Sequence, residues 1–363
     1  MPLRIAGGAD LAASYRGAVI GCGRTASLFE EDPLRRKPAS HMGHYRKSRR
    51  IRVVAGADID CERREFFKRR WRVKHVYRDY REMLAAERPD IVSLTAYAPE
   101  RHIMFKHCAE AGVKAIWIEK AIATSLCGAR SMVRLADKHH ITTVVNHPRR
   151  WSPKYIRTRE LIDIGAIGVP EAIVSTFSGN LIHTGTHAFD MMRFLFGEVT
   201  AVRGTPDGEF ALPDDSTDKK AIEDFGASGS LRFANGASGT INARAKDYFI
   251  FEFEILGSTG AIRIGNSTPL TLLKPAPARY ATHFEDLIPV DEAAAFPQGR
   301  RRRTGGAVPD LLAGLARGVE STNSIGQGFK ALEIALGFHE SFRVGGEWIA
   351  LPLAKSSLKI DSR

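Results

Sequence analysis

The sequence has few cysteines, and their spacing suits neither a metal site nor disulfides. Its 363 residues contain only four, Cys22, Cys61, Cys108 and Cys127, which stand far apart and form no C-x-x-C pair. A zinc site built on thiols and a disulfide framework are therefore not expected. A chain of this length is stable without disulfides, so we expect a reducing compartment, the cytoplasm.

Long apolar runs are also missing. No stretch of about 18 uninterrupted apolar residues occurs, which predicts that no segment spans a membrane. The proportions of hydrophobic residues (44%) and charged residues (26%) exclude a disordered or collagen-like chain. At about 100–200 residues per domain, the length alone predicts two or three domains.

Positive charge exceeds negative charge, with 53 Lys and Arg against 41 Asp and Glu and a net charge of +12. A basic surface attracts nucleic acid or an anionic substrate. The basic residues are mostly interspersed with acidic ones, and the longest basic run, Arg300 to Arg303, lies among prolines and glycines as in a solvated loop. We therefore expect a small-molecule partner and no nucleic acid.

The first part of the chain alternates between apolar runs and segments with helical spacing. Alternation at this spacing predicts right-handed βαβ units and a parallel sheet. The expected strands are 17–23, 51–57, 90–96, 113–118 and 141–146, and the expected helices are 78–87, 101–111 and 126–139.

After residue 150 the pattern changes to many short β-like runs, with Asn235-Gly236 as a hairpin signal. This predicts a second, α+β domain with a large, mostly antiparallel sheet that has helices on one face. We place the domains at residues 1–148 and 149–363. The expected strands are 171–177, 199–204, 220–226, 228–234, 237–244, 248–256 and 260–264, and the expected helices are 153–164, 185–196, 308–319 and 327–343.

A glycine-rich turn follows the first expected strand. Residues 21–26, Gly-Cys-Gly-Arg-Thr-Ala, match G-x-G-x-x-G/A and open an expected helix, as in a dinucleotide-binding fold. Gly21 permits the tight turn, Gly23 lets the backbone approach a pyrophosphate, and Ala26 is small enough for close packing of helix on strand. The helix N-terminus would attract the phosphates. A glycine-rich turn without a ligand is the alternative.

Asp58 ends the second expected strand, where a carboxylate would accept hydrogen bonds from an adenosine ribose. It lies 32 residues after Ala26, against about 20 in the simplest pattern. We assign the excess to an inserted loop at 30–41. An ordinary acid at the end of a strand is the alternative.

Seven segments together resemble the glucose–fructose oxidoreductase / inositol dehydrogenase / rhizopine catabolism (Gfo/Idh/MocA) family of NAD(P)-dependent oxidoreductases. The similarity covers about residues 15–355. The segments are AVIGCGRTA, VVAGAD, TAYAPERH, AIWIEKAIATS, NHPRRWSPKYIRTRELIDIGAIG, HTGTHAFDMMRFLFGEV and ALEIALGFHESFRVGGEWIALPL.

The resemblance implies a doubly wound Rossmann domain that holds NAD or NADP, and a C-terminal domain that closes the substrate site with its open sheet. It implies a dehydrogenase or reductase that acts on a secondary alcohol or ketone of a sugar, cyclitol or sugar derivative, and a homodimer or homotetramer. Asp58 would repel a 2′-phosphate and Ile59 offers no positive charge, so we expect NAD. Arg24 and the basic residues 35–37 leave NADP open.

The residues expected to contact the cofactor follow from the glycine turn, the strand ends and the matching motifs. They are Gly21, Gly23, Arg24, Thr25, Ala26, Asp58, Ile59, Ala96, Tyr97, Pro99, His102, Glu119, Lys120 and Asn146.

Lys120, His187 and His183 are the expected catalytic residues. Lys120 ends a parallel strand, beside the crevice where such sheets bind ligands, and could hydrogen-bond the substrate oxygen. His187 lies in the first turn of a helix, which disfavours an imidazolium and keeps the ring a neutral base. A surface lysine and a helix-cap histidine are the alternatives.

His183, Arg150 and Asp190 are expected to contact substrate. Asp190 shares a helix face with His187 and could orient it. Arg150 could bind an acidic group of the substrate or form an ion pair with a surface carboxylate. His183 and His187 are four residues apart, a spacing that also occurs in metal sites of the H-E-x-x-H type. The intervening Gly185 suggests that the helix starts after His183, so we expect no metal.

Three positions depart from the family pattern. Ala121 replaces the proline of the Glu-Lys-Pro motif, so we expect a trans peptide bond after Lys120. Tyr97-Ala98-Pro99 stands where the family has Thr-Pro-Asn, and His183 replaces an aspartate. These departures leave two alternatives: an NAD-using glycosidase or lyase with transient sugar oxidation, and a catalytically altered cofactor-binding protein.

Overall fold

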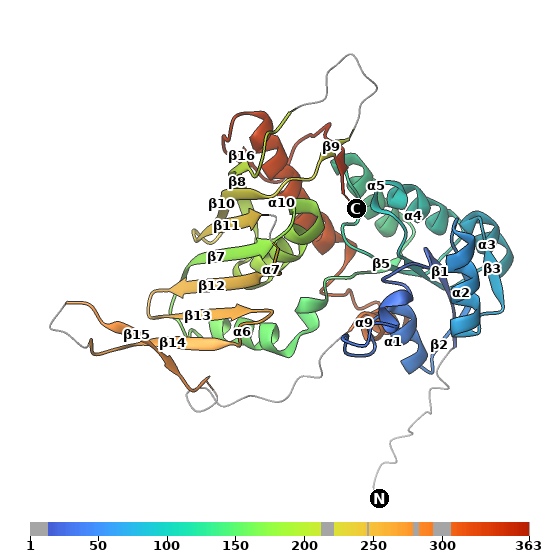
Figure 1. Ribbon diagram of the computed structural model, residues 1–363, viewed down its shortest axis with the longest axis horizontal. Coiled ribbons are helices and arrows are strands. Elements are labelled where there is room, and N and C mark those ends of the chain that lie inside the picture. The colour runs from blue at the N-terminus through green and yellow to red at the C-terminus, as the bar shows by residue number, and fades with distance from the viewer. Residues whose placement is uncertain (1–13, 212–220, 245–246, 279–282, 293–305, 363) are drawn as a thin grey trace, which may run out of the picture. The chain divides into compact units, whose positions relative to one another are not determined.

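The computed structural model describes residues 14–211, 221–244, 247–278, 283–292 and 306–362 (Figure 1). Contacts divide the chain into two compact units, one made of Met1–Ala96 and His107–Trp117 and the other of Tyr97–Lys106 and Ile118–Arg363. The basic run at 300–303 lies outside the described residues. Within the described part, no helix is both long enough and apolar enough to cross a membrane.

The N-terminal sheet has six strands in the order β3-β2-β1-β4-β5-β6. The pairs β1–β2, β1–β4 and β2–β3 are parallel, so the predicted doubly wound sheet is confirmed. Every residue of β4 and β5 is buried, as expected for strands covered on both faces. The strands are β1 Tyr15–Ile20, β2 Ile51–Ala57, β3 His75–Tyr77, β4 Ile91–Leu94, β5 Ala115–Ile118 and β6 Thr142–Val145.

Side-chain caps define where several helices of this part of the chain begin. Ser40, Asp60, Asp79 and Ser125 each accept a hydrogen bond from a backbone N–H in the first turn that follows. The helices are α1 His41–Lys47, α2 Cys61–Trp71, α3 Tyr80–Glu87, α4 Arg101–Glu110 and α5 Leu126–Lys138.

The expectation that a helix opens directly at the glycine turn is wrong. Only a short 3-10 helix, η1 (Leu28–Glu30), follows the turn, and the first α-helix begins at His41. The Glu30 carboxylate accepts hydrogen bonds from the N–H groups of Ala39 (2.9 Å) and Ser40 (3.0 Å). These contacts hold the intervening segment as a folded loop.

The second sheet has nine strands in the order β15-β14-β13-β12-β7-β11-β10-β8-β16. Within the described residues, β7 and β11 are the only neighbours of this sheet that pair in parallel, which confirms the mostly antiparallel prediction. The strands are β7 Pro170–Ser178, β8 Val199–Pro206, β10 Ala227–Phe233, β11 Ser238–Arg244, β12 Phe251–Gly257, β13 Gly260–Gly265, β14 Thr271–Ala276, β15 Asp286–Val290 and β16 Ile349–Ala350.

The strand expected at 220–226 is shorter, β9 (Ile222–Glu223), and pairs in parallel with β17 (Ile360–Asp361) near the end of the chain. Residue 220 of the expected strand lies outside the described residues. This two-stranded pairing brings the C-terminal segment beside residues 222–224, a contact that matters for the site below.

Helices cover one face of the nine-stranded sheet (Figure 1). They are α6 Pro153–Asp163, α7 Thr186–Phe196 and α10 Ile325–Arg343; α9 is Ala307–Arg317, and a single π-helical turn, η4 Leu181–Gly185, precedes α7. Every second residue of β11 is buried. The Phe189 ring of α7 stacks on Phe338 of α10 with centroids 5.6 Å apart, so aromatic packing forms the core of this layer.

Gly229 of β10 is packed so closely against α10 that a side chain cannot fit. A Cβ there would lie 2.4 Å from the Phe338 ring and 2.6 Å from the Arg203 carbonyl oxygen. We expect Gly229→Ala to lower the free energy of unfolding by about 1–3 kcal/mol, because the strand backbone has to shift. Urea unfolding followed by circular dichroism measures the change.

Gly326→Ala is the matched control. The nearest atom to a Cβ at Gly326, in the first turn of α10, is the Ser324 hydroxyl at 3.7 Å, so this change should be neutral or stabilising. Equal stabilities of the two variants would contradict the close packing of α10 on β10.

Candidate active site

The glycine turn at the end of β1 has the shape that a dinucleotide requires. Gly21 has φ of +91°, and a Cβ there would lie 2.6 Å from the backbone nitrogen of Ala96. Ala26 is fully buried. In the described part of the chain, the N–H groups of Gly23, Arg24 and Thr25 have no hydrogen-bond acceptor. Adjacent free N–H groups of this kind form an anion-binding concavity, so these residues fit a pyrophosphate.

Asp58 directly follows β2 and stabilises this turn. One carboxylate oxygen accepts from the N–H of Cys22 (2.8 Å), and the other accepts from the N–H of Asp60 (2.9 Å). A carboxylate oxygen accepts about two hydrogen bonds, so each oxygen keeps capacity for a ribose hydroxyl. Ile59 is 85% exposed. The structure thus brings the turn and Asp58 together, and their role as cofactor ligands remains a prediction.

Glu119 and Lys120 follow the end of β5, as expected. The Glu119 carboxylate accepts a hydrogen bond from the Asn146 side chain (2.7 Å). The buried Arg101 guanidinium donates to the carbonyl oxygens of Glu119 (2.9 Å) and Ala121.

The Lys120–Ala121 peptide bond is cis, so the expectation of a trans bond is wrong. That expectation rested on the general preference of non-proline bonds. It did not anticipate the buried Arg101, which lies 18 residues before Glu119 in the sequence and binds the carbonyl groups on both sides of Lys120.

Tyr97, Pro99 and His102 lie around a short 3-10 helix, η2 (Ala98–Glu100), and the start of α4. The Tyr97 hydroxyl donates to the Asp361 carboxylate at 3.1 Å, and His102 Nδ1 lies 3.1 Å from the Pro99 carbonyl oxygen. None of these contacts joins them to Lys120, and their role toward a cofactor remains a prediction.

Lys120 is held against the turn that carries His183. Its Nζ donates to the His183 carbonyl oxygen at 2.7 Å. Burial lowers the pKa of Lys120 to about 8, and the positive charges of Arg101 and Arg149 act in the same direction. The amine therefore exchanges its proton close to neutral pH, as a general acid or base should.

His187 lies in the first turn of α7 with its Nδ1 atom buried and without a hydrogen-bond partner in the described part of the chain. Burial holds the pKa of His187 far below its ordinary value, and the charges of Arg149, Lys120 and His147 lower it further. The ring is therefore neutral at pH 7, as the sequence predicts. Burial is the main cause, whereas the sequence argument relied on the helix N-terminus.

Asp190 lies one turn further along α7 and belongs to a buried network behind His187. Its carboxylate accepts hydrogen bonds from Arg150 Nε (2.9 and 3.0 Å) and lies 3.3 Å from His147 Nδ1. Burial opposes ionisation of Asp190, but His147 and Arg150 outweigh it and lower its pKa to about 2.

The His147 ring contacts the His187 ring edge-on at 5.3 Å, so Asp190 supports His187 indirectly. The contacts of Arg150 and Asp190 favour a positioning role over contact with substrate. Their assignment as substrate ligands remains a prediction.

Two further side chains of this neighbourhood were not among the site residues predicted from the sequence. The Arg149 guanidinium lies 3.6 Å from the centre of the Phe251 ring and donates to Asn266 Oδ1 (3.2 and 3.3 Å). The second is Asp224, next to β9. Its carboxylate is 4% exposed and accepts from the N–H groups of Ile182 (2.8 Å) and His183 (2.9 Å).

Asp224 thus fixes the backbone of the turn against which Lys120 is hydrogen-bonded. The Ser362 hydroxyl also donates to it at 3.3 Å, and Asp224 with Ser362 and His183 lines a cavity of about 570 Å³. Burial raises the pKa of Asp224 to about 6. Within the described residues, no group of three or more His, Cys, Asp or Glu side chains could hold a metal ion.

The chain has an NAD-binding Rossmann fold of the oxidoreductase type. Residues 15–147 match the family model described as "Oxidoreductase family, NAD-binding Rossmann fold", and residues 176–263 match the "GFO/IDH/MocA C-terminal domain". The chain belongs to the GFO/IDH/MocA family.

Known relatives include a D-apiose dehydrogenase from Paraburkholderia graminis, 30% identical over 203 residues that cover 51% of this chain and 51% of the relative. An inositol 2-dehydrogenase from Rhizobium meliloti is 31% identical over 193 residues, 47% of this chain and 55% of the relative. The chain therefore matches about half the length of these relatives. A levoglucosan dehydrogenase in complex with NADH and levoglucosan has the same fold, with a TM-score of 0.70, 20% identity and coverage of 93% of this chain and 99% of that one.

The raised pKa of Asp224 makes stability depend on pH. Its pKa rises from 3.8 to about 6 on folding, so the folded protein binds more protons than the unfolded chain between these values. The contribution of Asp224 to stability is therefore lost as pH rises. We expect the free energy of unfolding of the wild type, relative to Asp224→Asn, to fall by about 2 kcal/mol between pH 4.5 and 7.

Urea unfolding of both proteins across this pH range measures the difference, and Asp163→Asn, at an exposed acid of α6, controls for general charge effects. A difference that stays constant or grows with pH would contradict the assignment of a raised pKa to the buried Asp224.

Proposed function

We propose that this protein is an NAD(P)-dependent dehydrogenase or reductase that prefers NAD. Its substrate is a secondary alcohol, or the corresponding ketone, of a sugar, cyclitol or sugar derivative. The observation that carries the proposal is the presence of Lys120, with a pKa lowered to about 8, and a neutral His187 in one half-buried neighbourhood. The names of the apiose and inositol dehydrogenases among its relatives support the substrate class.

A bound nicotinamide would supply the hydride chemistry, and the protein would supply orientation and proton transfer. In oxidation, the neutral amine of Lys120 accepts the hydroxyl proton of the substrate. In reduction, the Lys120 ammonium returns a proton to the carbonyl oxygen. His187 is neutral and accepts a hydrogen bond from a substrate hydroxyl or takes the proton onward, while the exposed His183 contacts neighbouring hydroxyl groups.

Positive side chains near His187 suit this chemistry. Lys120 and Arg149 approach His187 closely enough to lower its pKa. The charge of Asp190 is balanced by its ion pair with Arg150. Negative charge that develops on the substrate oxygen would therefore be stabilised by Lys120 and Arg149.

A cytoplasmic location and assembly as a homodimer or homotetramer are part of the same proposal. All four cysteine thiols are free, which supports a reducing compartment. The proposed assembly rests on the family resemblance, which assigns it to the open sheet of the C-terminal domain.

We expect NAD⁺ to bind more tightly than NADP⁺. The Asp58 carboxylate would accept hydrogen bonds from the ribose 2′-hydroxyl and would repel a 2′-phosphate. Fluorescence titration of the purified protein with both nucleotides measures the preference. Asp58→Ser should narrow the difference, and Asp60→Ser, two residues further on, is the control. Tighter NADP⁺ binding to the wild type would contradict the assignment of Asp58.

We expect Lys120→Ala and His187→Ala each to lower turnover by about 10²–10⁴-fold with NAD⁺ affinity nearly unchanged, since each removes a proton-transfer group. The rate of oxidation by the wild type should rise with pH through about 8, because the neutral amine is the base. Lys120→Ala should lose this ionisation. NADH formation with a panel of polyols, sugars and cyclitols provides the assay, and Lys138→Ala, at the exposed end of α5, is the control.

Near wild-type turnover in Lys120→Ala would contradict its role. Turnover of a glycoside without net NADH formation would favour the glycosidase or lyase alternative. Bound nucleotide with neither activity would favour a cofactor-binding protein that has lost the proton relay.

A further inference from the structure

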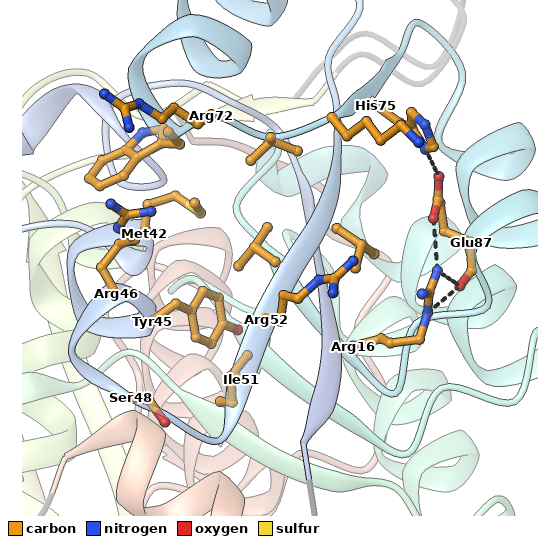
Figure 2. Close-up of a pocket in the computed structure, with 15 residues that line it drawn as sticks. Arg16, Met42, Tyr45, Arg46, Ser48, Ile51, Arg52, Arg72, His75 and Glu87 are labelled. Atoms are coloured by element: carbon orange, nitrogen blue, oxygen red, sulfur yellow. Dashed lines mark hydrogen bonds and ion pairs between the residues drawn. The ribbon is translucent and has the colours of Figure 1, made fainter.

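A second cavity lies in the first unit, at the edge of the parallel sheet opposite the glycine turn. Its volume is about 750 Å³, within the range of small-molecule pockets. It is bounded by the beginnings of β1, β2 and β3 and by the C-terminal ends of α1, α2 and α3 (Figure 2). The residues assigned above to cofactor binding and catalysis do not line it.

The floor of this cavity is apolar. Met42, Tyr45, Val54, Trp71 and Val73 line it and are all buried. The polar atoms of the two aromatic residues are already bonded inside the unit: the Trp71 indole donates to Ser27 Oγ at 2.6 Å, and the Tyr45 hydroxyl lies 2.8 Å from Ser93 Oγ. A ligand on this floor therefore meets hydrocarbon and aromatic surface.

The rim of the cavity is cationic. Arg46 and Arg72 lie along one side and Arg16 and Arg52 along the other (Figure 2), and Lys74 is also part of the lining. These five positive side chains face a single carboxylate, which belongs to Glu87 at the end of α3. Arg16 and His75 are both bonded to Glu87.

The other four positive side chains have no ion-pair or hydrogen-bond partner in the described part of the chain. The ends of helices account for only some of them. Arg46 lies in the last turn of α1 and Arg72 is the C-cap residue of α2. At these positions a positive charge interacts favourably with the helix dipole. Arg52 belongs to β2 and Lys74 directly precedes β3. The interaction with helix dipoles therefore does not account for the positive charges of Arg52 and Lys74, although both residues face the same cavity.

We propose that this cavity binds a small organic phosphate monoester with an apolar body. The phosphate lies among Arg46, Arg52, Arg72 and Lys74, and the apolar body lies on the floor that contains Trp71. A guanidinium group can bind two phosphate oxygens at once. The two negative charges of a phosphate monoester would neutralise part of the surplus positive charge of the rim. The bounded volume and apolar floor favour a small molecule over a polyanion that needs only surface charge.

Isothermal titration calorimetry of the full-length protein in saturating NAD⁺ tests this site, because the glycine turn is then occupied. The probes are 1-naphthyl phosphate, inorganic phosphate and 1-naphthol. We expect 1-naphthyl phosphate to bind with a stoichiometry of one per chain. Its affinity should exceed that of either fragment by at least tenfold, because only this probe uses both the rim and the floor.

The double variant Arg52→Gln/Arg72→Gln should weaken 1-naphthyl phosphate binding by at least tenfold. Arg69→Gln/Arg78→Gln removes the same charge from exposed positions of the same unit that do not line the cavity, and should change binding by less than twofold. Circular dichroism and NAD⁺ affinity show that both variants remain folded.

A second measurement uses the fluorescence of Trp71. Binding of 1-naphthyl phosphate should change tryptophan emission in the wild type, and Trp71→Phe should lose most of this change while still binding the probe. The proposal is overturned if the binding of 1-naphthyl phosphate does not saturate or if inorganic phosphate binds as tightly as 1-naphthyl phosphate. It is also overturned if the two double variants weaken the binding of 1-naphthyl phosphate to the same extent.

Discussion

The buried ion pair between Asp190 and Arg150 is the constraint on which the candidate active site depends. Asp190 lies on α7, and Arg150 lies in the segment that follows β6. Arg150 also donates to the Thr322 carbonyl oxygen at 3.1 Å, just before α10, so one guanidinium joins three segments that are distant in the sequence. Removing one partner of such a pair leaves an uncompensated buried charge, at a cost of about 3–5 kcal/mol. The positions of His147 and His187 follow from this network.

Burial then determines the proton affinities of the site. The same low-polarity surroundings lower the pKa values of Lys120 and His187 and raise that of Asp224. Charges that in water would interact weakly act strongly here, because little solvent screens them. Perturbed groups of this kind concentrate at functional sites. The lowered pKa of Lys120 supports the proton-transfer role proposed for it, because an ordinary lysine stays protonated at neutral pH.

Local sequence patterns predicted the features that depend on nearby residues. The parallel strands, the glycine at position 21 and helix α7 follow from apolar periodicity and from turn chemistry. The roles of Asp224 and Arg101 could not be predicted, because their partners lie many positions away: Asp224 bonds His183, 41 residues before it. The prediction of a helix directly after the glycine turn was wrong for the same reason. The Glu30 carboxylate holds the following loop by accepting hydrogen bonds from Ala39 and Ser40, nine and ten residues further on.

The exchange of the family's aspartate for His183 gains a physical meaning from Asp224. The side chain at position 183 is no longer a carboxylate. The carboxylate of Asp224 lies behind the backbone of this position and accepts a hydrogen bond from the N–H group of His183. The carbonyl oxygen of His183 in turn accepts a hydrogen bond from Lys120 Nζ. The negative charge of Asp224 thus acts on Lys120 across space and without direct contact, and it opposes the lowering of the Lys120 pKa. The side chain of His183 is exposed, whereas its backbone is held on both sides, at the N–H group by Asp224 and at the carbonyl group by Lys120.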